Sequence, residues 1–131
     1  MLVGYKFVFG AAAATLLLVV VNSSSSATAT AAAPTAPPAF AKCAACHSVV
    51  RGAPAKIGPN LAGIVGAKAG TRAGGRYSPA LKKSGIIWSR ANLIRYMKDP
   101  KAMVPGTTMP NPMVTRPADA DAILAYLSKS K

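Results

Sequence analysis

The chain has almost no acidic residues and few of the side chains from which metal clusters and disulfides are built. Its 131 residues include no glutamate, three aspartates, one histidine and two cysteines, against 16 lysines and arginines. A structural zinc site normally takes four ligands, mostly Cys and His. No second Cys/His cluster is present, so Asp99, Asp119 or Asp121 would have to complete such a site. Zinc is therefore only a minor alternative.

All three of the scarce residues lie in one segment, Cys43-Ala44-Ala45-Cys46-His47. The Cys-x-x-Cys-His spacing is typical of c-type haem attachment. Two residues between the cysteines on a helical turn let both sulfurs reach the two vinyl groups of one porphyrin, and the next residue points an imidazole at the iron. A thioredoxin-like pair would need a strand–helix–strand pattern around the motif, which the alanine-rich flanks lack. The motif predicts one covalent haem c (one iron) and no disulfide.

The first third of the chain has the pattern of a leader. A short start carries one positive charge at Lys6, residues 7–21 have no charge, and a stretch rich in Ser, Thr and Ala follows. Secretory signal peptides have this order, and Ala27-Thr28-Ala29 fits their small-residue cleavage pattern. The alternative is an uncleaved membrane anchor, because residues 2–21 approach the length that a bilayer requires.

These features predict three parts. We expect a signal peptide (or uncleaved anchor) over residues 1–29, an Ala/Thr/Pro linker over 30–38 and one folded domain over 39–131. With either kind of leader the domain lies outside the cytoplasm, in the compartment where haem c is attached. The predicted location is periplasmic, and a retained anchor would be the only link to the membrane.

The mature domain is strongly basic. Loss of the leader removes only Lys6, so the net charge is 15 − 3 = +12. The basic residues are scattered from Lys42 to Lys131 with no aromatic interleaving and no single basic helix or tail, which disfavours nucleic acid as a partner. A diffuse positive field that steers the domain towards acidic protein surfaces is the better interpretation.

The hydrophobic pattern predicts an all-α domain of three to five helices with long loops, and no segment alternates like a strand. Residues 48–77 and 101–116 are expected to be loops, and loops of such length need something to organise them, as a haem does. The expected helices run from about Pro38 into the haem motif, from Ser78-Pro79 to Gly85, from Ser89 to Asp99-Pro100, and from Pro117 through Ala120, Ile123, Leu124 and Leu127.

Eight short segments carry a family resemblance that spans roughly Ala39 to Leu127. In chain order they are Cys43–His47, Gly58–Gly63, Tyr77-Ser78, Gly85–Trp88, Leu93–Tyr96, Asp99-Pro100, Pro105–Met109 and Ala125–Leu127. In these segments and their spacing the chain resembles the class I cytochromes c, of the mitochondrial and bacterial c2-type branch. The resemblance implies a small cytochrome c fold around one haem, and a monomer.

The resemblance also implies how the haem is held. Cys43 and Cys46 would form the thioethers, and His47 would be the proximal iron ligand. The carbonyl of Pro59 would accept a hydrogen bond from the other ring nitrogen of His47 and fix its orientation. Met109 would supply the distal thioether, and such His/Met ligation raises the reduction potential.

Four further residues have implied roles. Tyr96 and Thr107 would line the methionine side of the haem, whereas Tyr77 and Trp88 would approach its propionates. All three aromatic residues could equally be core residues whose polar tips find a partner. Met113 competes with Met109 as the sulfur ligand, but the Pro-Gly-Thr-Thr-Met frame favours Met109.

The chain departs from the family pattern around the haem. Ala67 stands where many relatives have an arginine near a propionate. Either Lys68 or Arg72 replaces that arginine, or the propionate is less neutralised. Leu81 stands where the mitochondrial branch has a buried asparagine, so that wall is more apolar. After the ligand, residues 110–113 (Pro-Asn-Pro-Met) replace the usual aromatic residue and glycine.

The start of the domain also departs from the family pattern. Phe40 matches a bacterial aromatic residue three positions before the first cysteine. Ala36-Pro37-Pro38, however, replaces the turn that usually docks on the last helix. The sequence therefore does not predict a contact between the first and last helices.

The predicted function is one-electron transport and not enzymatic catalysis. The resemblance implies a quinol–cytochrome c reductase-type donor and a terminal oxidase or other reductase as acceptor, in a respiratory or related chain. The alternative is an open-site haem c protein with peroxidase or gas-sensing activity. It would need a weak Met109 bond, and the sequence offers no distal His or Arg constellation for peroxide cleavage.

Overall fold

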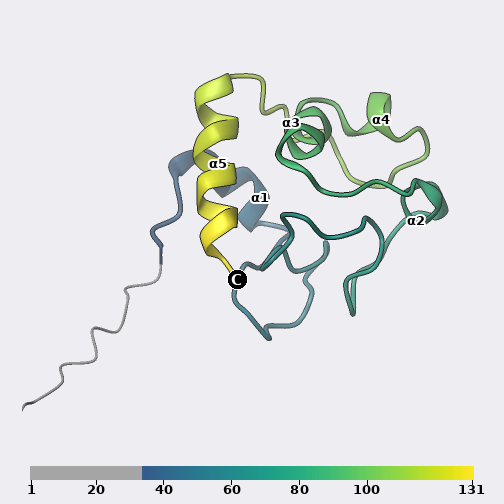
Figure 1. Ribbon diagram of the computed structural model, residues 1–131, viewed down its shortest axis with the longest axis horizontal. Helices are drawn as coiled ribbons and strands as arrows, with labels where there is room; N and C mark the ends of the chain where they lie inside the picture. The colour runs from purple at the N-terminus through teal and green to yellow at the C-terminus, as the bar shows by residue number, and fades with distance from the viewer. Residues whose placement is uncertain (1–33) are drawn as a thin grey trace, which may run out of the picture. The chain divides into compact units, whose positions relative to one another are not determined.

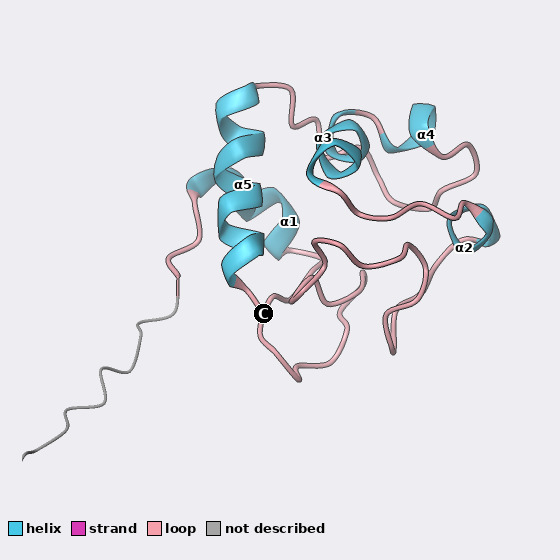
Figure 2. Ribbon diagram, in the orientation of Figure 1, coloured by secondary structure: helices cyan, strands magenta, loops and turns pink. Residues whose placement is uncertain are grey.

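The computed structural model describes residues 34–131, so the predicted leader and the first residues of the linker lie outside the described residues. In this range the chain forms short helices joined by long loops, with no strand (Figures 1 and 2). The all-α prediction is confirmed. No helix of residues 34–131 has the length and apolar character to span a bilayer. The helices are η1 (Pro38–Phe40), α1 (Ala41–Ala44), α2 (Pro79–Lys83), α3 (Arg90–Lys98), α4 (Pro100–Met103) and α5 (Pro117–Lys129).

Two serines begin the helices α2 and α3, as predicted. The Leu81 N–H donates to Ser78 Oγ (3.1 Å), and Pro79 takes the first helical position of α2. The Asn92 N–H donates to Ser89 Oγ (3.2 Å) at the start of α3. Each hydroxyl satisfies one of the backbone donors that the first turn of a helix leaves without a partner.

The prediction of loop for residues 101–116 is wrong at its start, where α4 lies. Asp99 ends α3, but its carboxylate also accepts the Ala102 N–H (3.0 Å), and Pro100 occupies the first helical position. Proline has no N–H to lose there and already has the φ of a helix. One Asp-Pro pair therefore ends one helix and begins the next.

The first and last helices are in contact although the usual docking turn is missing. The ring of Phe40 meets the ring of Tyr126 edge-on, with 4.9 Å between centroids. Phe40 is only 2% exposed, and Ile123 of α5 is fully buried. The contact is made by η1, which packs on α5 just before α1 begins. Burial of this aromatic pair replaces the turn that residues 36–38 no longer provide.

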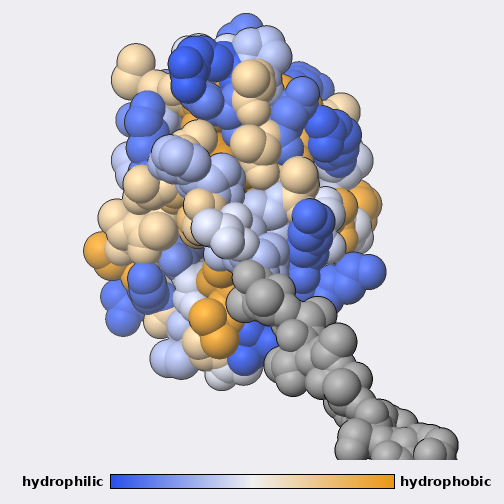
Figure 3. All heavy atoms as spheres, turned by 90° about the vertical axis from the view of Figure 1, so that its left-hand side faces the viewer, coloured by the Kyte–Doolittle hydropathy of each residue, from blue (hydrophilic) through white to orange (hydrophobic). Residues whose placement is uncertain are grey.

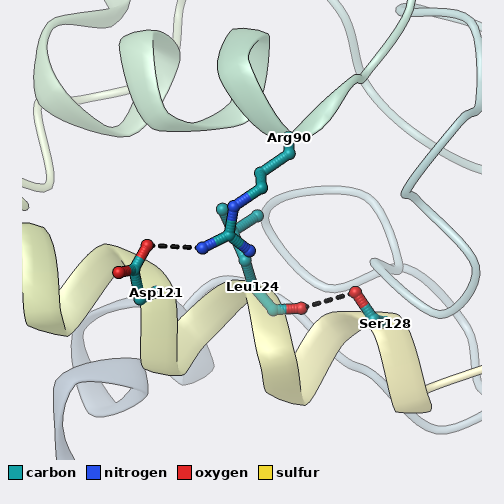
Figure 4. A network of polar contacts seen from close by, with 4 residues as sticks. All are labelled: Arg90, Asp121, Leu124 and Ser128. Atoms are coloured by element: carbon teal, nitrogen blue, oxygen red, sulfur yellow. Dashed lines mark hydrogen bonds and ion pairs between the residues drawn. The ribbon is translucent and has the colours of Figure 1, made fainter.

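Helices α3 and α5 pack through apolar faces, with Leu93 and Met97 of α3 in the same buried cluster as Leu124 of α5. One ion pair crosses at their edge, where Arg90 Nη2 lies 2.5 Å from Asp121 Oδ1 (Figure 4). More than half of each side chain in this pair is exposed, so it contributes at most about 1 kcal/mol. The apolar faces dominate the stability of this contact.

The long loop between α1 and α2 is held by its own backbone hydrogen bonds. The Gly58 N–H donates to the Cys46 carbonyl (2.8 Å) and the Leu61 N–H to the Ser48 carbonyl (2.7 Å), so the loop folds back on the end of the haem motif. Further along, the Gly63 N–H donates to the carbonyl of Ser130, just beyond α5. These bonds fix the loop to both ends of the domain.

We expect Ile123→Ala to destabilise the domain by about 2 to 5 kcal/mol, because it leaves a cavity in the core. Ile87→Ala is the matched control, since Ile87 is 49% exposed and its truncation should cost roughly 0.5 kcal/mol or less. The free energy of unfolding in denaturant measures both. Equal losses would mean that α5 does not anchor the core.

Candidate functional site

One cavity of about 400 Å³ lies at the centre of the domain, and its lining contains all nine residues proposed from the sequence. They come from α1, the α1–α2 loop, the α2–α3 connection, α3 and the segment after α4. Most of the other lining residues are apolar. Among them is the buried Leu81, which contributes an apolar side chain to the cavity wall, as expected. The nine are Cys43, Cys46, His47, Pro59, Tyr77, Trp88, Tyr96, Thr107 and Met109.

The two cysteines share one face of a helical turn. The N–H groups of Cys46 and His47 both donate to the Cys43 carbonyl, at 3.0 and 2.8 Å. Residues three apart on such a turn are neighbours on its surface. Both thiols are free, and burial raises the pKa of Cys43. The turn thus presents two thiols side by side to the cavity, as thioether attachment requires.

The imidazole of His47 is held in one orientation. Its Nδ1 lies 2.8 Å from the Pro59 carbonyl oxygen. A carbonyl only accepts, so Nδ1 carries the proton and Nε2 keeps its lone pair. Burial lowers the pKa of His47, the hydrogen bond to Pro59 opposes this, and nearby Lys56 lowers it further. The ring is therefore favoured in its neutral form, which is the form that binds metals.

Gly58 makes room for this ring. A Cβ at position 58 would lie 2.4 Å from Cε1 and 2.8 Å from Nδ1 of His47. Any larger residue would displace the imidazole from Pro59. The glycine of the Gly-Pro-Asn segment is thus explained by close approach to His47.

On the other side of the cavity, hydroxyl groups fix the segment that carries Met109. The hydroxyls of Tyr96 and Thr107 are 2.6 Å apart and buried. The Met109 N–H donates to Thr107 Oγ1 at 3.4 Å. Tyr96 also packs on Trp88, with 4.9 Å between ring centroids. Burial raises the pKa of Tyr96 although its bond to Thr107 opposes this, so the hydroxyl stays protonated.

The two candidate sulfur ligands differ in position. Met109 is half-buried and lines the central cavity. Met113 is 63% exposed and lies only on a smaller neighbouring cavity of about 300 Å³, together with Met109 and Lys42. The geometry favours Met109, as the sequence does.

Lys68 and Arg72, the candidates to replace the missing arginine at position 67, do not line the central cavity. The backbone and charge of Arg72 nevertheless act on Tyr77, which does line it. Arg76 also lines the cavity, next to Tyr77. Lys68 is held in a backbone bridge to Ile87, and Arg72 lies over Gly63. Arg76 was not among the sequence candidates, although it stands directly before Tyr77.

The donor set fits a covalent haem. Such a group brings a flat apolar ring, two vinyl groups, an iron and two carboxylates. The cavity offers apolar walls, two adjacent thiols, an oriented imidazole, and at one end the buried hydroxyl of Tyr77, which has no hydrogen-bond partner among residues 34–131. In the same range no cluster of three or more His, Cys, Asp or Glu side chains could hold a metal. Zinc therefore remains without support there.

Comparisons with known proteins agree with this site. The sequence model of the family described as Cytochrome c matches residues 38–131. The chain is 48% identical to cytochrome c2 iso-2 of Magnetospirillum fulvum over 92 residues, 70% of this chain and 95% of the relative. It is 44% identical to a cytochrome c of Cannabis sativa over 89 residues, which are 68% of this chain and 80% of the relative. The solved structure of cytochrome cH from Methylobacterium extorquens superposes with a TM-score of 0.64 at 47% identity, covering 69% of this chain and 90% of that one.

We expect Gly58→Ala to break the hydrogen bond between His47 and Pro59, because the added methyl group would overlap the ring. The ¹⁵N NMR signal of the imidazole, unambiguous in a chain with one histidine, should shift. Stability should fall by about 1 to 3 kcal/mol. Gly52→Ala is the control: φ there is +77° with no atom within 4 Å, so it strains the backbone but leaves His47 unchanged. An unshifted signal in Gly58→Ala would contradict the close approach.

Proposed function

Because the chain belongs to the cytochrome c family, we propose that it carries single electrons between larger redox complexes, with its iron held by His47 and Met109. The family has one covalently bound haem c and acts in electron transfer. The observation that carries the proposal is that His47 and Met109 line the same cavity as the two cysteines. The haem supplies a one-electron couple between ferric and ferrous iron.

The protein's own part is to hold both axial ligands in place before and after the electron moves. Pro59 orients His47 through a 2.8 Å hydrogen bond. Thr107 holds the backbone of Met109 and is itself bound by Tyr96. Ligands fixed in this way move little between redox states. With both positions filled by side chains, no substrate needs to bind and no catalytic residue is required.

The partners we propose are acidic redox proteins. The mature domain has 15 basic and 3 acidic residues, and hydrophilic side chains are spread over the face seen in Figure 3 and do not form one band. A diffuse positive field speeds encounter more than it tightens binding. A quinol–cytochrome c reductase-type donor and a terminal oxidase or other reductase fit this description, met in brief contacts of small area. The proposed site of action is the periplasm, as a monomer.

The axial ligands are tested by visible spectra of the purified holoprotein. We expect sharp low-spin haem c bands, a far-red sulfur-to-ferric-iron band, and no response of the reduced protein to carbon monoxide. Met109→Ala should lose the far-red band and bind carbon monoxide, because it opens one axial position. Met113→Ala, the matched control, should keep both properties.

Two outcomes would contradict the assignment. Loss of the far-red band in Met113→Ala but not in Met109→Ala would show that Met113 is the sulfur ligand. A wild-type protein with high-spin bands that shift with carbon monoxide would have an open iron, which favours a peroxidase or a gas sensor.

The role of charge is tested by reaction rates at different salt concentrations. Lys42 is exposed and borders the smaller cavity beside Met109 and the cysteines, whereas Lys101 on α4 lines neither cavity. We expect Lys42→Gln to slow electron transfer to an acidic acceptor roughly two- to fivefold at low ionic strength and much less at high salt. Lys101→Gln should change the rate less. A wild-type rate unaffected by salt would rule out electrostatic docking.

A further inference from the structure

The lining of the central cavity contains one charged side chain, that of Arg76. Arg76 is exposed and also lines the cavity, so the residue stands at the mouth, where the cavity meets solvent. The rest of the lining is apolar side chains, the cysteines, His47, and a few hydroxyl groups. A single cation at the mouth of a largely apolar cavity marks the place where an anionic group of a ligand is best accommodated.

The protein itself does not neutralise Arg76. All three aspartates are engaged elsewhere: Asp99 accepts the Ala102 N–H, Asp119 pairs with Arg116 and Asp121 with Arg90. The sequence has no glutamate. No acidic side chain thus remains to pair with Arg76.

A second polar group without a partner lies next in the chain. The Tyr77 hydroxyl is buried and makes no hydrogen bond of good geometry among residues 34–131. Burial raises the pKa of Tyr77, and the nearby backbone and charge of Arg72 oppose this rise. The ring of Tyr77 folds back over Gly75, where a Cβ would lie 2.6 Å from the ring carbon that bears the hydroxyl. The neighbouring Ser78 hydroxyl is already used to cap α2. Burying a hydroxyl without a partner costs free energy, which an acceptor at this place would recover.

We propose that Arg76 binds a haem carboxylate, at the end of the haem to which the family resemblance already assigns Tyr77. Arginine pairs with carboxylates through two parallel N–H···O bonds, which makes it suited to this task. The inference rests on the haem site of the proposed function and assigns to Arg76 the role for which Lys68 and Arg72 were the sequence candidates. Arg72 is the real competitor, since its backbone and its charge both oppose the rise that burial gives to the pKa of Tyr77.

The reduction potential reports on this pairing. A carboxylate near the iron stabilises the ferric form, and a paired cation cancels that effect. Arg76→Gln should therefore lower the potential. We expect a shift of about three- to tenfold in the equilibrium constant for electron exchange with the wild type, where tenfold corresponds to about 59 mV for one electron. Arg76→Lys keeps the charge but loses the two-pronged geometry, so its shift should be smaller.

Arg72→Gln and Lys68→Gln each remove one positive charge from a residue that does not line the central cavity. They measure how much the loss of any nearby positive charge changes the reduction potential. Both should shift the potential clearly less than Arg76→Gln. Equal shifts in Arg72→Gln and Arg76→Gln, or no shift in Arg76→Gln, would overturn the proposal. A failure of the proposed function is seen separately, in the wild-type spectrum, since Arg76→Gln should retain the far-red band and the low-spin form.

A direct readout does not depend on the potential. In the reduced holoprotein, the ¹⁵Nε–H signal of a guanidinium bound to a carboxylate exchanges slowly with water. We expect the Arg76 signal to be observed at neutral pH and the Arg72 signal to be broadened. Tyr77→Phe should speed the exchange of Arg76, because it removes the neighbouring donor. A fast-exchanging Arg76 signal in the wild type would place this side chain in free solvent and refute the pairing.

Discussion

The hydrogen bond from His47 Nδ1 to the Pro59 carbonyl is the contact on which the rest of the site depends. It joins the end of the first helix to a long loop, and it requires glycine at position 58. The same loop reaches the C-terminal end of α5 through the bond from Gly63 to Ser130. The orientation of the His47 imidazole is thus connected to both ends of the domain. A change in the loop would alter the orientation of this ring in the cavity.

The scarcity of acidic residues has a structural and a functional side. Each aspartate has a definite structural task, one as a helix cap and two in exposed ion pairs. The remaining basic residues are not neutralised within the domain. This arrangement costs some stability through self-repulsion but leaves a positive field that acts beyond the surface. The same shortage of acidic residues leaves Arg76, at the mouth of the cavity, without a protein carboxylate to pair with. It can therefore pair with a carboxylate of the proposed haem.

Much of the fold could be predicted from local chemistry. Ser78, Ser89 and Pro117 marked the starts of three helices, because caps and prolines act within one turn. The start of α4 was missed since Asp99-Pro100 read only as a stop. The nine site residues could be placed through family motifs, and they line one cavity. Arg76 could not, because it lies nine residues beyond position 67, and only the folded loop shows which cation borders the cavity.

The segment after Met109, which departs from the family pattern, holds its own backbone in a tight turn. Met113 has φ of +52°, a left-handed conformation that costs on the order of 1 kcal/mol in a residue other than glycine. Its N–H donates to Asn111 Oδ1 at 2.8 Å, which closes a tight turn, and the flanking prolines restrict the backbone further. The turn leaves Met113 exposed, away from the central cavity. A stiff Pro-Asn-Pro turn therefore limits the ways in which this segment can withdraw the Met109 side chain from the cavity, as the proposed ligation requires.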